Sequence, residues 1–484
     1  MSEEVLMKSV FSLIISGMLV YHCWTQEERE TESELKDDKR SRYATTIPVL
    51  ILPCVIFMIF GIIMTKLGLR ESIEVIMALC FEIFMQISIF YMILLLLLPL
   101  LRRYFSAKAC AILWILPTFL YYVTYSTMNN VEPLFVITIP SRVVHIVTII
   151  WSAGFLLIFS YYIVSHFRFR KYILSNTDFM IDEKARVIWD EEKRYANIQN
   201  NLDIVISPNV KTPLSIGLFR GTTKVVLPER EYMEEELRLI FRHELVHIGR
   251  EDSCTKLFIL FCTAICWFNP LMWIAMRKSA DDLELSCDET VLGDADDMTR
   301  KQYAKLILET EGNHRGFTTC LSASATALRY RLSNIVKKRK LWSGGLLVGL
   351  ILFILMMTSG YIALAYDEGI GENVVFYAGN TAEHDLSSVM LDGVNGSNYM
   401  TCTDEDALKE YLSKLDISKL TSDYTFSNDK ERIICIFQGP NEAFGVNLTE
   451  HHLTVSKFQQ DELEVETYYV ASGVDWDYIL ELLE

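Results

Sequence analysis

Six apolar runs, each about as long as the roughly 20 residues needed to cross a bilayer, constrain this chain more than any other feature. They lie near residues 5–23, 47–66, 75–100, 109–123, 142–165 and 342–364. The 484 residues are 51% apolar and the mean hydropathy is +0.23, which is high for a soluble protein. The runs predict a polytopic α-helical membrane protein. The first run is expected to be a retained anchor, because its start is acidic and no small-residue cleavage pattern follows it.

Basic clusters beside these runs predict the orientation, because cytoplasmic loops hold lysine and arginine more readily than translocated loops. The clusters lie at residues 39–42, 102–103, 168–171 and 337–340. Five spans before residue 168 place all four clusters in the cytosol and the amino terminus outside. Residues 66–71 and 126–141 then form outer loops.

This topology divides the chain into four parts. Residues 1–166 are a transmembrane region of about five spans, 167–340 a cytosol-facing domain, 341–365 the final transmembrane helix and 366–484 an external domain. Residues 367–484 carry 24 acidic and 6 basic side chains, so the tail accounts for the net charge of −17. Such a tail repels nucleic acid, and no direct nucleic-acid binding is expected.

The tail alternates two kinds of pattern. Residues 432–437 and 444–455 are strand-like, and residues 405–415 and 476–483 are helix-like, which predicts a small α+β fold. None of the eleven cysteines shows a CxxC spacing. Cys402 and Cys435 are the two in the tail, and either a single disulfide or two buried free thiols is compatible with the sequence.

The segment HELVH at residues 243–247 carries the candidate chemistry. A strand-like run at 223–227 ends at Pro228, and a helix is predicted from Glu234 onward. His243 and His247 then lie one turn apart, so that both imidazoles can bind one zinc ion, with Glu244 as the general base. The five residues alone are also compatible with an amphipathic helix bearing two surface histidines.

A hydrolytic zinc site needs a third protein ligand, and two candidates lie downstream. Glu284 and Asp288 are four residues apart and share a helical face, so one can bind the metal while the other orients a ligand histidine. Acidic clusters are more often solvated faces, and it is HELVH that favours the metal interpretation. The apolar segment at 254–276 would separate the two halves if it crossed the membrane, so its break at Asn269 and Pro270 predicts a membrane-embedded helical pair that returns to the cytosolic side.

Several segments in a fixed order resemble the BlaR/MecR family of bacterial membrane metallopeptidases. They are LRRYFSAK at 101–108, SPNVKTP at 207–213, GL at 217–218, VVLP at 225–228, HELVH at 243–247, RED at 250–252, WFNP at 267–270 and ELSCDE at 284–289. The resemblance covers about residues 75–365. It implies a gluzincin-type α+β domain facing the cytosol of a bacterial cell membrane, with one zinc ion.

The resemblance also implies roles for individual residues and partners. His243, His247 and Glu284 would bind zinc, Glu244 would be the base and Asp288 would support a ligand without binding the metal. The strand at 223–227 is similar to the edge strand on which such peptidases hold an extended substrate. In this family an outer signal leads to proteolysis inside the cell, including self-cleavage and removal of a cytosolic transcriptional repressor, which implies a repressor partner here.

Two departures from the family concern the tail and the amino terminus. The tail is about half the size of a penicillin-binding domain and has no KTG; residues 427–430 match SxxK only in a polar setting, so covalent beta-lactam binding is not expected. The runs at 5–23 and 47–66 are additional. A constitutive HtpX-like quality-control protease and a non-catalytic receptor that retains the zinc fold are the alternative functions. Glycines at 344, 345 and 349 would allow close helix packing and a homodimer.

Overall fold

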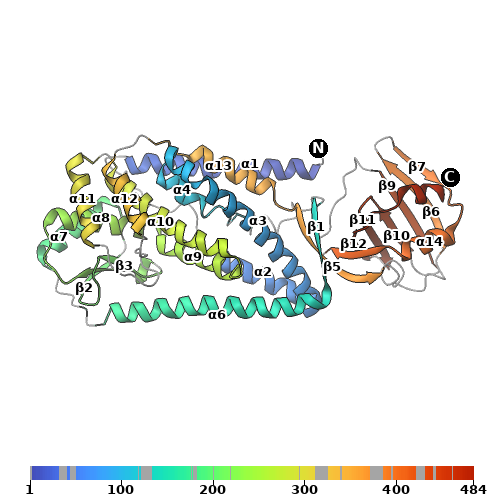
Figure 1. Cartoon of the computed structure of the whole chain (residues 1–484), viewed down its shortest axis with the longest axis horizontal. Helices are drawn as coiled ribbons and strands as arrows, with labels where there is room; N and C mark the ends of the chain where they lie inside the picture. The colour runs from blue at the N-terminus through green and yellow to red at the C-terminus, as the bar shows by residue number, and fades with distance from the viewer. Residues whose placement is uncertain are drawn as a thin grey trace.

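The computed structural model describes most of the chain. The residues outside the description are 1–2, 32–40, 44–50, 118, 121–132, 176, 178–181, 200, 219, 294, 311–324, 338–340, 371–384, 394–395, 421–430, 440–442, 460–461 and 484. The SxxK match at 427–430 therefore lies outside the described residues. Along its long axis the molecule has a mixed α/β end, a central helical bundle and a large β-sheet at the opposite end (Figure 1).

The central bundle is built from the apolar runs. Its helices are α1 (Glu3–Thr31), α2 (Ile51–Leu67), α3 (Leu69–Tyr104), α4 (Ala107–Leu113), α6 (Ser141–Ile173) and α13 (Gly345–Met357). Three of them, within Val5–Thr31, Ser72–Tyr104 and Val143–Ile173, are long and apolar enough to cross a membrane, whereas α2 and α13 are shorter apolar helices. Only 11% of the apolar window of α6 is buried, which is typical of a helix that faces lipid rather than protein.

Two of the predicted spans differ from the structure. The run at 109–123 contains the seven-residue helix α4, and its side chains from Ala109 to Leu116 are buried inside the bundle instead of facing outward. The run at 342–364 contains only the 13 residues of α13, and a strand begins at Ile362. Apolar composition is shared by lipid-facing and core segments, which is why the runs looked alike in the sequence.

The helix ends sort into two groups (Figure 1). The first residues of α1 and α6, the α2–α3 turn at Gly68 and the last residues of α13 lie at the end beside the large sheet. The last residues of α1, α3 and α6 lie at the mixed α/β end. The helices thus run between two ends of the molecule, and the basic residues Arg102 and Arg103 lie at the α/β end with the candidate site.

The tail and strand β1 together form a nine-stranded sheet in the order β1-β5-β8-β12-β11-β10-β9-β6-β7. Its strands are β1 (Phe135–Pro140), β5 (Ile362–Ile370), β6 (Asp385–Gly393), β7 (Gly396–Met400), β8 (Asp416–Leu420), β9 (Arg432–Gln438), β10 (Ala443–Leu448), β11 (His452–Gln459) and β12 (Glu462–Val470). The helices α14 (Glu405–Ser413) and α15 (Trp476–Glu481) contribute Leu408, Leu412 and Ile479 to its core. The run predicted as one strand at 444–455 is the hairpin β10–β11. Cys402 and Cys435 are free thiols that belong to this core.

Strand β1 comes from the predicted outer loop at 126–141 and was not predicted as a strand. It pairs in parallel with β5, from Phe135 opposite Ile362 to Pro140 opposite Asp367. Helix α6 begins directly after β1, at Ser141. The sheet of the tail is therefore joined to the bundle both through α13, which precedes β5, and through α6.

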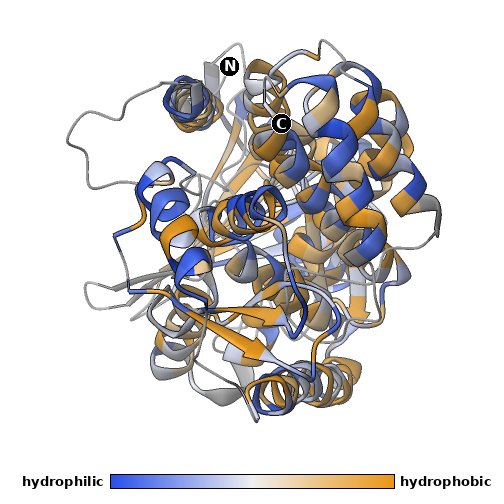
Figure 2. Cartoon of the chain, turned by 90° about the vertical axis from the view of Figure 1, so that its left-hand side faces the viewer, coloured by the Kyte–Doolittle hydropathy of each residue, from blue (hydrophilic) through white to orange (hydrophobic). Residues whose placement is uncertain are grey.

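The mixed α/β end holds the candidate site. It contains α7 (Glu183–Tyr195), β2 (Asp203–Ser207), β3 (Leu214–Ile216), β4 (Lys224–Pro228), α8 (Glu234–Arg250), α11 (Asp297–Thr310) and α12 (Ala325–Val336). The view onto this end shows the largely apolar strands of its sheet below helices that carry many hydrophilic residues (Figure 2). The strand order is β2-β4-β3, so β4 is the central strand. The prediction that residues 223–227 form an edge strand is wrong, because β2 and β3 pair with the two sides of β4.

The glycines of α13 have an intrachain role. A Cβ atom on Gly349 would lie 2.3 Å from Val20 Cγ2 on α1, and one on Gly345 would lie 3.5 Å from Cys23 Cβ. These glycines therefore let α1 and α13 pack closely within one chain, as small residues do between membrane helices. A homodimer stays a prediction.

We expect Gly349→Ala to lower the stability of the full chain in detergent by about 1–3 kcal/mol, because the added methyl group overpacks the α1–α13 contact. Truncating the clashing partner with Val20→Ala in the same chain is expected to restore most of the loss. Gly61→Ala on α2 is the matched control, since a Cβ there meets nothing within 4 Å. Thermal unfolding midpoints are measured for the wild type and these three variants, and an unchanged midpoint for Gly349→Ala contradicts the packing.

Candidate metal centre

Helix α8 presents both histidines of HELVH to one buried point. Three glutamates in its first turn, at 234–236, complement the positive end of the helix dipole. The helix ends where Glu251 adopts a left-handed conformation with φ of 56°, and α9 (Asp252–Ile265) starts at the next residue. This abrupt change of direction places Asp252 beside His247.

A helical pair brings the third candidate ligand to the same point. Helix α9 leads away from α8, the chain turns at Asn269, which caps α10 (Pro270–Leu292), and α10 returns. Both helices of this pair contact each other and the bundle helices α3 or α6. The turn lies at the predicted break, and α10 carries Glu284 to the histidines.

The three candidate ligand atoms form a compact triangle. His243 Nε2 and His247 Nε2 are 3.1 Å apart. Glu284 Oε2 is 3.7 Å from the first and 3.5 Å from the second. Tetrahedral ligands at zinc distances of 2.0–2.1 Å are separated from each other by about 3.3 Å. The residues present therefore fit one zinc ion with little movement.

The second nitrogen of each imidazole is bound by another side chain. His247 Nδ1 is 2.6 Å from Asp252 Oδ2. His243 Nδ1 is 2.8 Å from the hydroxyl of Tyr303, and that hydroxyl donates to Asp288 Oδ1 at 2.7 Å. The Nδ1 protons are thus held by acceptors, which leaves both Nε2 lone pairs for a metal.

Glu284 has the character of a metal ligand. It is buried, and its Oε2 has no hydrogen-bond partner among the described residues. Its other oxygen, Oε1, accepts from Lys256 Nζ at 3.3 Å. Burial alone would raise the pKa of Glu284, but His247 and Lys256 lower it well below the usual value of 4.5. The carboxylate is therefore charged, with one oxygen directed at the histidines.

Cys287 offers a second donor set with the same histidines. Its Sγ lies 3.2 Å from His243 Nδ1, and the ligand atoms of His243, His247 and Cys287 all lie within 4.8 Å of one another. However, Nδ1 of His243 is the atom that already contacts Tyr303. The set with Glu284 uses Nε2 of both histidines and preserves the contacts of both Nδ1 atoms, so we favour it on geometry.

The remaining predicted residues lie close by but differ in their contacts. Glu244 is buried on α8 between the two histidines. Asp288 Oδ1 is 3.8 Å from His243 Nδ1, so it reaches the histidine through Tyr303 instead of directly. Asp288 is held in turn by Arg331, with Nε to Oδ2 at 2.5 Å.

Sequence reasoning missed four neighbours of this centre, namely Asp252, Lys256, Tyr303 and Arg331. Asp252 belongs to the segment RED at 250–252, whose spacing from His247 could have identified it. Buried Asp252 is kept ionised, because Arg250 and His247 lower its pKa against the effect of burial. The other three have no local spacing that relates them to HELVH.

Comparison with known proteins relates this part of the chain to a peptidase family. The sequence profile described as BlaR1 peptidase M56 matches residues 135–335. This region belongs to the BlaR1 peptidase M56 family. The matched range runs from β1 to α12 and contains every residue of the candidate centre, whereas α1 to α4, α13 and the whole tail lie outside it.

Individual relatives of this M56 region cover only parts of the chain. This chain is 28% identical to the regulatory protein BlaR1 of Bacillus licheniformis over 127 residues, which is 26% of this chain and 21% of that protein. It is 27% identical to the methicillin resistance mecR1 protein of Staphylococcus aureus over 175 residues, 35% and 29% of the two chains. It is 22% identical to BlaR1 of Staphylococcus aureus over 241 residues, 48% and 40%. The matches thus span less than half of each relative.

Proposed function

We propose that this M56 protein is a membrane-embedded zinc metalloendopeptidase that couples a stimulus on its C-terminal domain to cytosolic proteolysis. The observation that carries the proposal is the triangle of His243 Nε2, His247 Nε2 and Glu284 Oε2, whose separations of 3.1, 3.5 and 3.7 Å suit one tetrahedral ion. By analogy with the family, the substrates are a cytosolic transcriptional repressor and the chain itself.

The protein groups would divide the work of peptide hydrolysis. A bound zinc ion supplies Lewis acidity and a water molecule of lowered pKa. His243 and His247 bind through Nε2, with their Nδ1 protons held by Tyr303 and Asp252. Glu244 accepts the proton of the attacking water and returns it to the leaving amine.

Substrate would add to the sheet at β3. In the described sheet β3 is an edge strand, and it contacts α8. An extended peptide paired with the free edge of β3 would lie next to the helix that carries the histidines. This assignment replaces β4, whose two sides are both paired.

The arrangement of the bundle supports a topology for the bacterial cell membrane. Three helices are long enough to cross, and the basic Arg102 and Arg103 lie at the end of the molecule that holds the candidate centre. We therefore propose that this end faces the cytosol, that the nine-stranded sheet lies outside and that residues 254–276 are embedded in the membrane as a helical pair.

Glu244→Gln tests the proposed activity. Full-length protein is produced in bacterial membranes, together with the winged-helix repressor where one is encoded beside the gene, and processing of the chain and of the repressor is followed by immunoblot. We expect at least a hundredfold slower cleavage, since a general base contributes about 10²- to 10⁴-fold. Zinc content and membrane insertion should be unchanged.

Glu235→Gln is the matched control, because Glu235 is an exposed residue of the same helix. Persistent cleavage by Glu244→Gln contradicts the mechanism. A wild-type chain that binds zinc but cleaves nothing would favour the non-catalytic receptor. Cleavage of unfolded membrane proteins, with the neighbouring repressor left intact, would favour a housekeeping protease.

A further inference from the structure

Among the described residues of α12, only Arg331 forms ion pairs with the acidic residues of the candidate centre. Its Nε and NH2 bind the two oxygens of Asp288 at 2.5 and 2.7 Å. Its NH1 lies 3.6 Å from Glu284 Oε2. The side chain is 15% exposed, so this two-pronged contact is formed largely away from solvent, where such pairs are strong and geometrically specific.

The contact continues to a ligand nitrogen. Asp288 accepts from Tyr303, and the Tyr303 hydroxyl contacts His243 Nδ1. Arg331 thus fixes the Asp288 carboxylate, and this carboxylate holds the Tyr303 hydroxyl. The hydroxyl in turn orients the His243 imidazole. Without Arg331, the buried Asp288 carboxylate would be free to rotate away from Tyr303.

Helix α12 is also attached to the membrane bundle. Tyr330 is next to Arg331 in sequence. The guanidinium of Arg102 lies over the Tyr330 ring, 5.6 Å from the ring centroid. Arg102 pairs in turn with Asp282 on α10 at 2.6 Å. The neighbour of Arg331 is therefore joined to the end of α3, and α3 is joined to the helix that carries Glu284.

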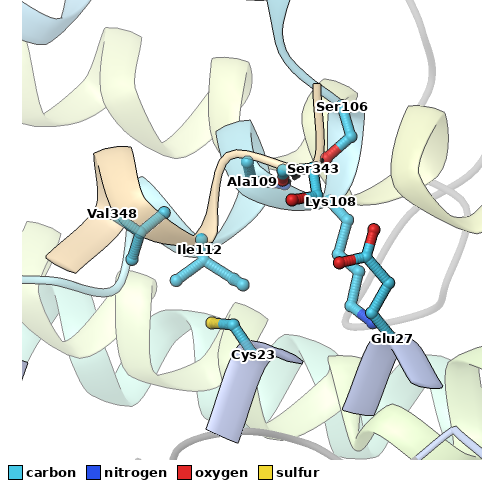
Figure 3. Close-up of a pocket in the computed structure, with 9 residues that line it drawn as sticks. Cys23, Glu27, Ser106, Lys108, Ala109, Ile112, Ser343 and Val348 are labelled. Atoms are coloured by element: carbon cyan, nitrogen blue, oxygen red, sulfur yellow. Dashed lines mark hydrogen bonds between the residues drawn. The ribbon is translucent and has the colours of Figure 1, made fainter. Parts of the chain in front are cut away.

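The residues just before α13 are hydrogen-bonded to Ser106, in the turn between α3 and α4. Ser106 N donates to Trp342 O at 2.8 Å, and Ser106 Oγ donates to Ser343 O at 2.9 Å. The close-up shows this junction, with Ser106 and Ser343 above a small pocket that Cys23 closes from α1 (Figure 3). Helix α12 is thus joined to the candidate centre through Arg331 and to the end of α3 through Tyr330, and the turn after α3 also holds the residues that lead into α13.

We infer that Arg331 is a positioning residue that ties α12, and with it the start of α13, to the metal ligands. It touches neither substrate nor reacting atoms, and it sets how firmly His243 and Glu284 hold the metal. This inference rests on the proposed zinc centre. It identifies α12 as the element through which a displacement of α13 would reach the zinc centre.

The test measures zinc affinity of the full chain in detergent by competition with a chelator. Arg331→Ala is expected to bind zinc about 10- to 100-fold more weakly, the usual loss when a partner of a ligand is removed. Arg331→Lys should fall between, because an ammonium group keeps the charge but cannot form the two-pronged contact. Arg329→Ala, an exposed arginine of the same helix, is the matched control and should leave the affinity unchanged.

A double-mutant cycle with Tyr303→Phe separates positioning from general packing. If the effect of Arg331 passes through Asp288 and Tyr303, Arg331→Ala should weaken zinc binding much less in the Tyr303→Phe background than in the wild type. Equal losses in both backgrounds, or wild-type affinity in Arg331→Ala, would overturn the inference while leaving the proposed function intact. Should Arg331→Ala fail to fold, the cycle is run with Arg331→Lys. A wild-type chain that binds no zinc would remove both proposals together.

Discussion

Glu284→Gln is expected to leave the purified full-length protein without stoichiometric zinc and without peptidase activity. The substitution keeps the size of the side chain but removes the charge, and a neutral amide is a poor zinc ligand. Glu284 is ionised in its buried setting because His247 and Lys256 lower its pKa well below 4.5. Metal content by elemental analysis and cleavage of the chain or of a repressor are the two measurements.

Two neighbours on α10 provide the comparison. Asp288→Asn should retain zinc with about 10- to 100-fold weaker affinity, because Asp288 acts on His243 through Tyr303. Cys287→Ser should retain stoichiometric zinc, since its Sγ faces Nδ1 of His243 and not Nε2. Loss of zinc in Cys287→Ser together with retention in Glu284→Gln would reverse the assignment and make the cysteine the third ligand.

The parts of the centre that are local in the chain could be predicted from the sequence. The spacing of His243 and His247 places both on one turn of any helix, and the prediction needs no tertiary information. The break at Asn269 likewise marks the point where α9 gives way to α10. Tyr303 and Arg331 could not be predicted, because their role depends on where α11 and α12 pack and no fixed spacing relates them to α8.

The errors in the fold have the same origin. A short apolar strand such as β4 looks alike at the centre and at the edge of a sheet, and its position is decided by partners elsewhere in the chain. Strand β1 pairs with β5, more than 200 residues away. The buried segment around Trp114 resembled a span because a core segment and a lipid-facing helix have the same composition. Its place in the core is set by a tertiary contact, in which Trp114 Nε1 donates to Asp282 at 2.7 Å.

Lys8 is a buried cation at the joint between the bundle and the tail. Its Nζ donates to the carbonyl of Ser359 and lies 5.5 Å from the centroid of the Tyr361 ring. Glu82 on α3 accepts from the N–H of Gly360 at 2.6 Å. A cation from α1 and a carboxylate from α3 thus hold the turn that ends α13 and leads into β5. Ionisable groups within membrane helices persist where such partners compensate them.

Lys8→Met is therefore expected to destabilise the full chain by about 1–3 kcal/mol, because it removes the buried hydrogen bond from Lys8 Nζ to the Ser359 carbonyl. Glu82→Gln alone should be nearly neutral, since the glutamine oxygen can still accept from the N–H of Gly360. Lys66→Met, at an exposed position near the end of α2, is the matched control. Unfolding in detergent would be compared for the wild type and these three variants. If Lys8→Met were no less stable than Lys66→Met, Lys8 could not be what holds the α13–β5 turn.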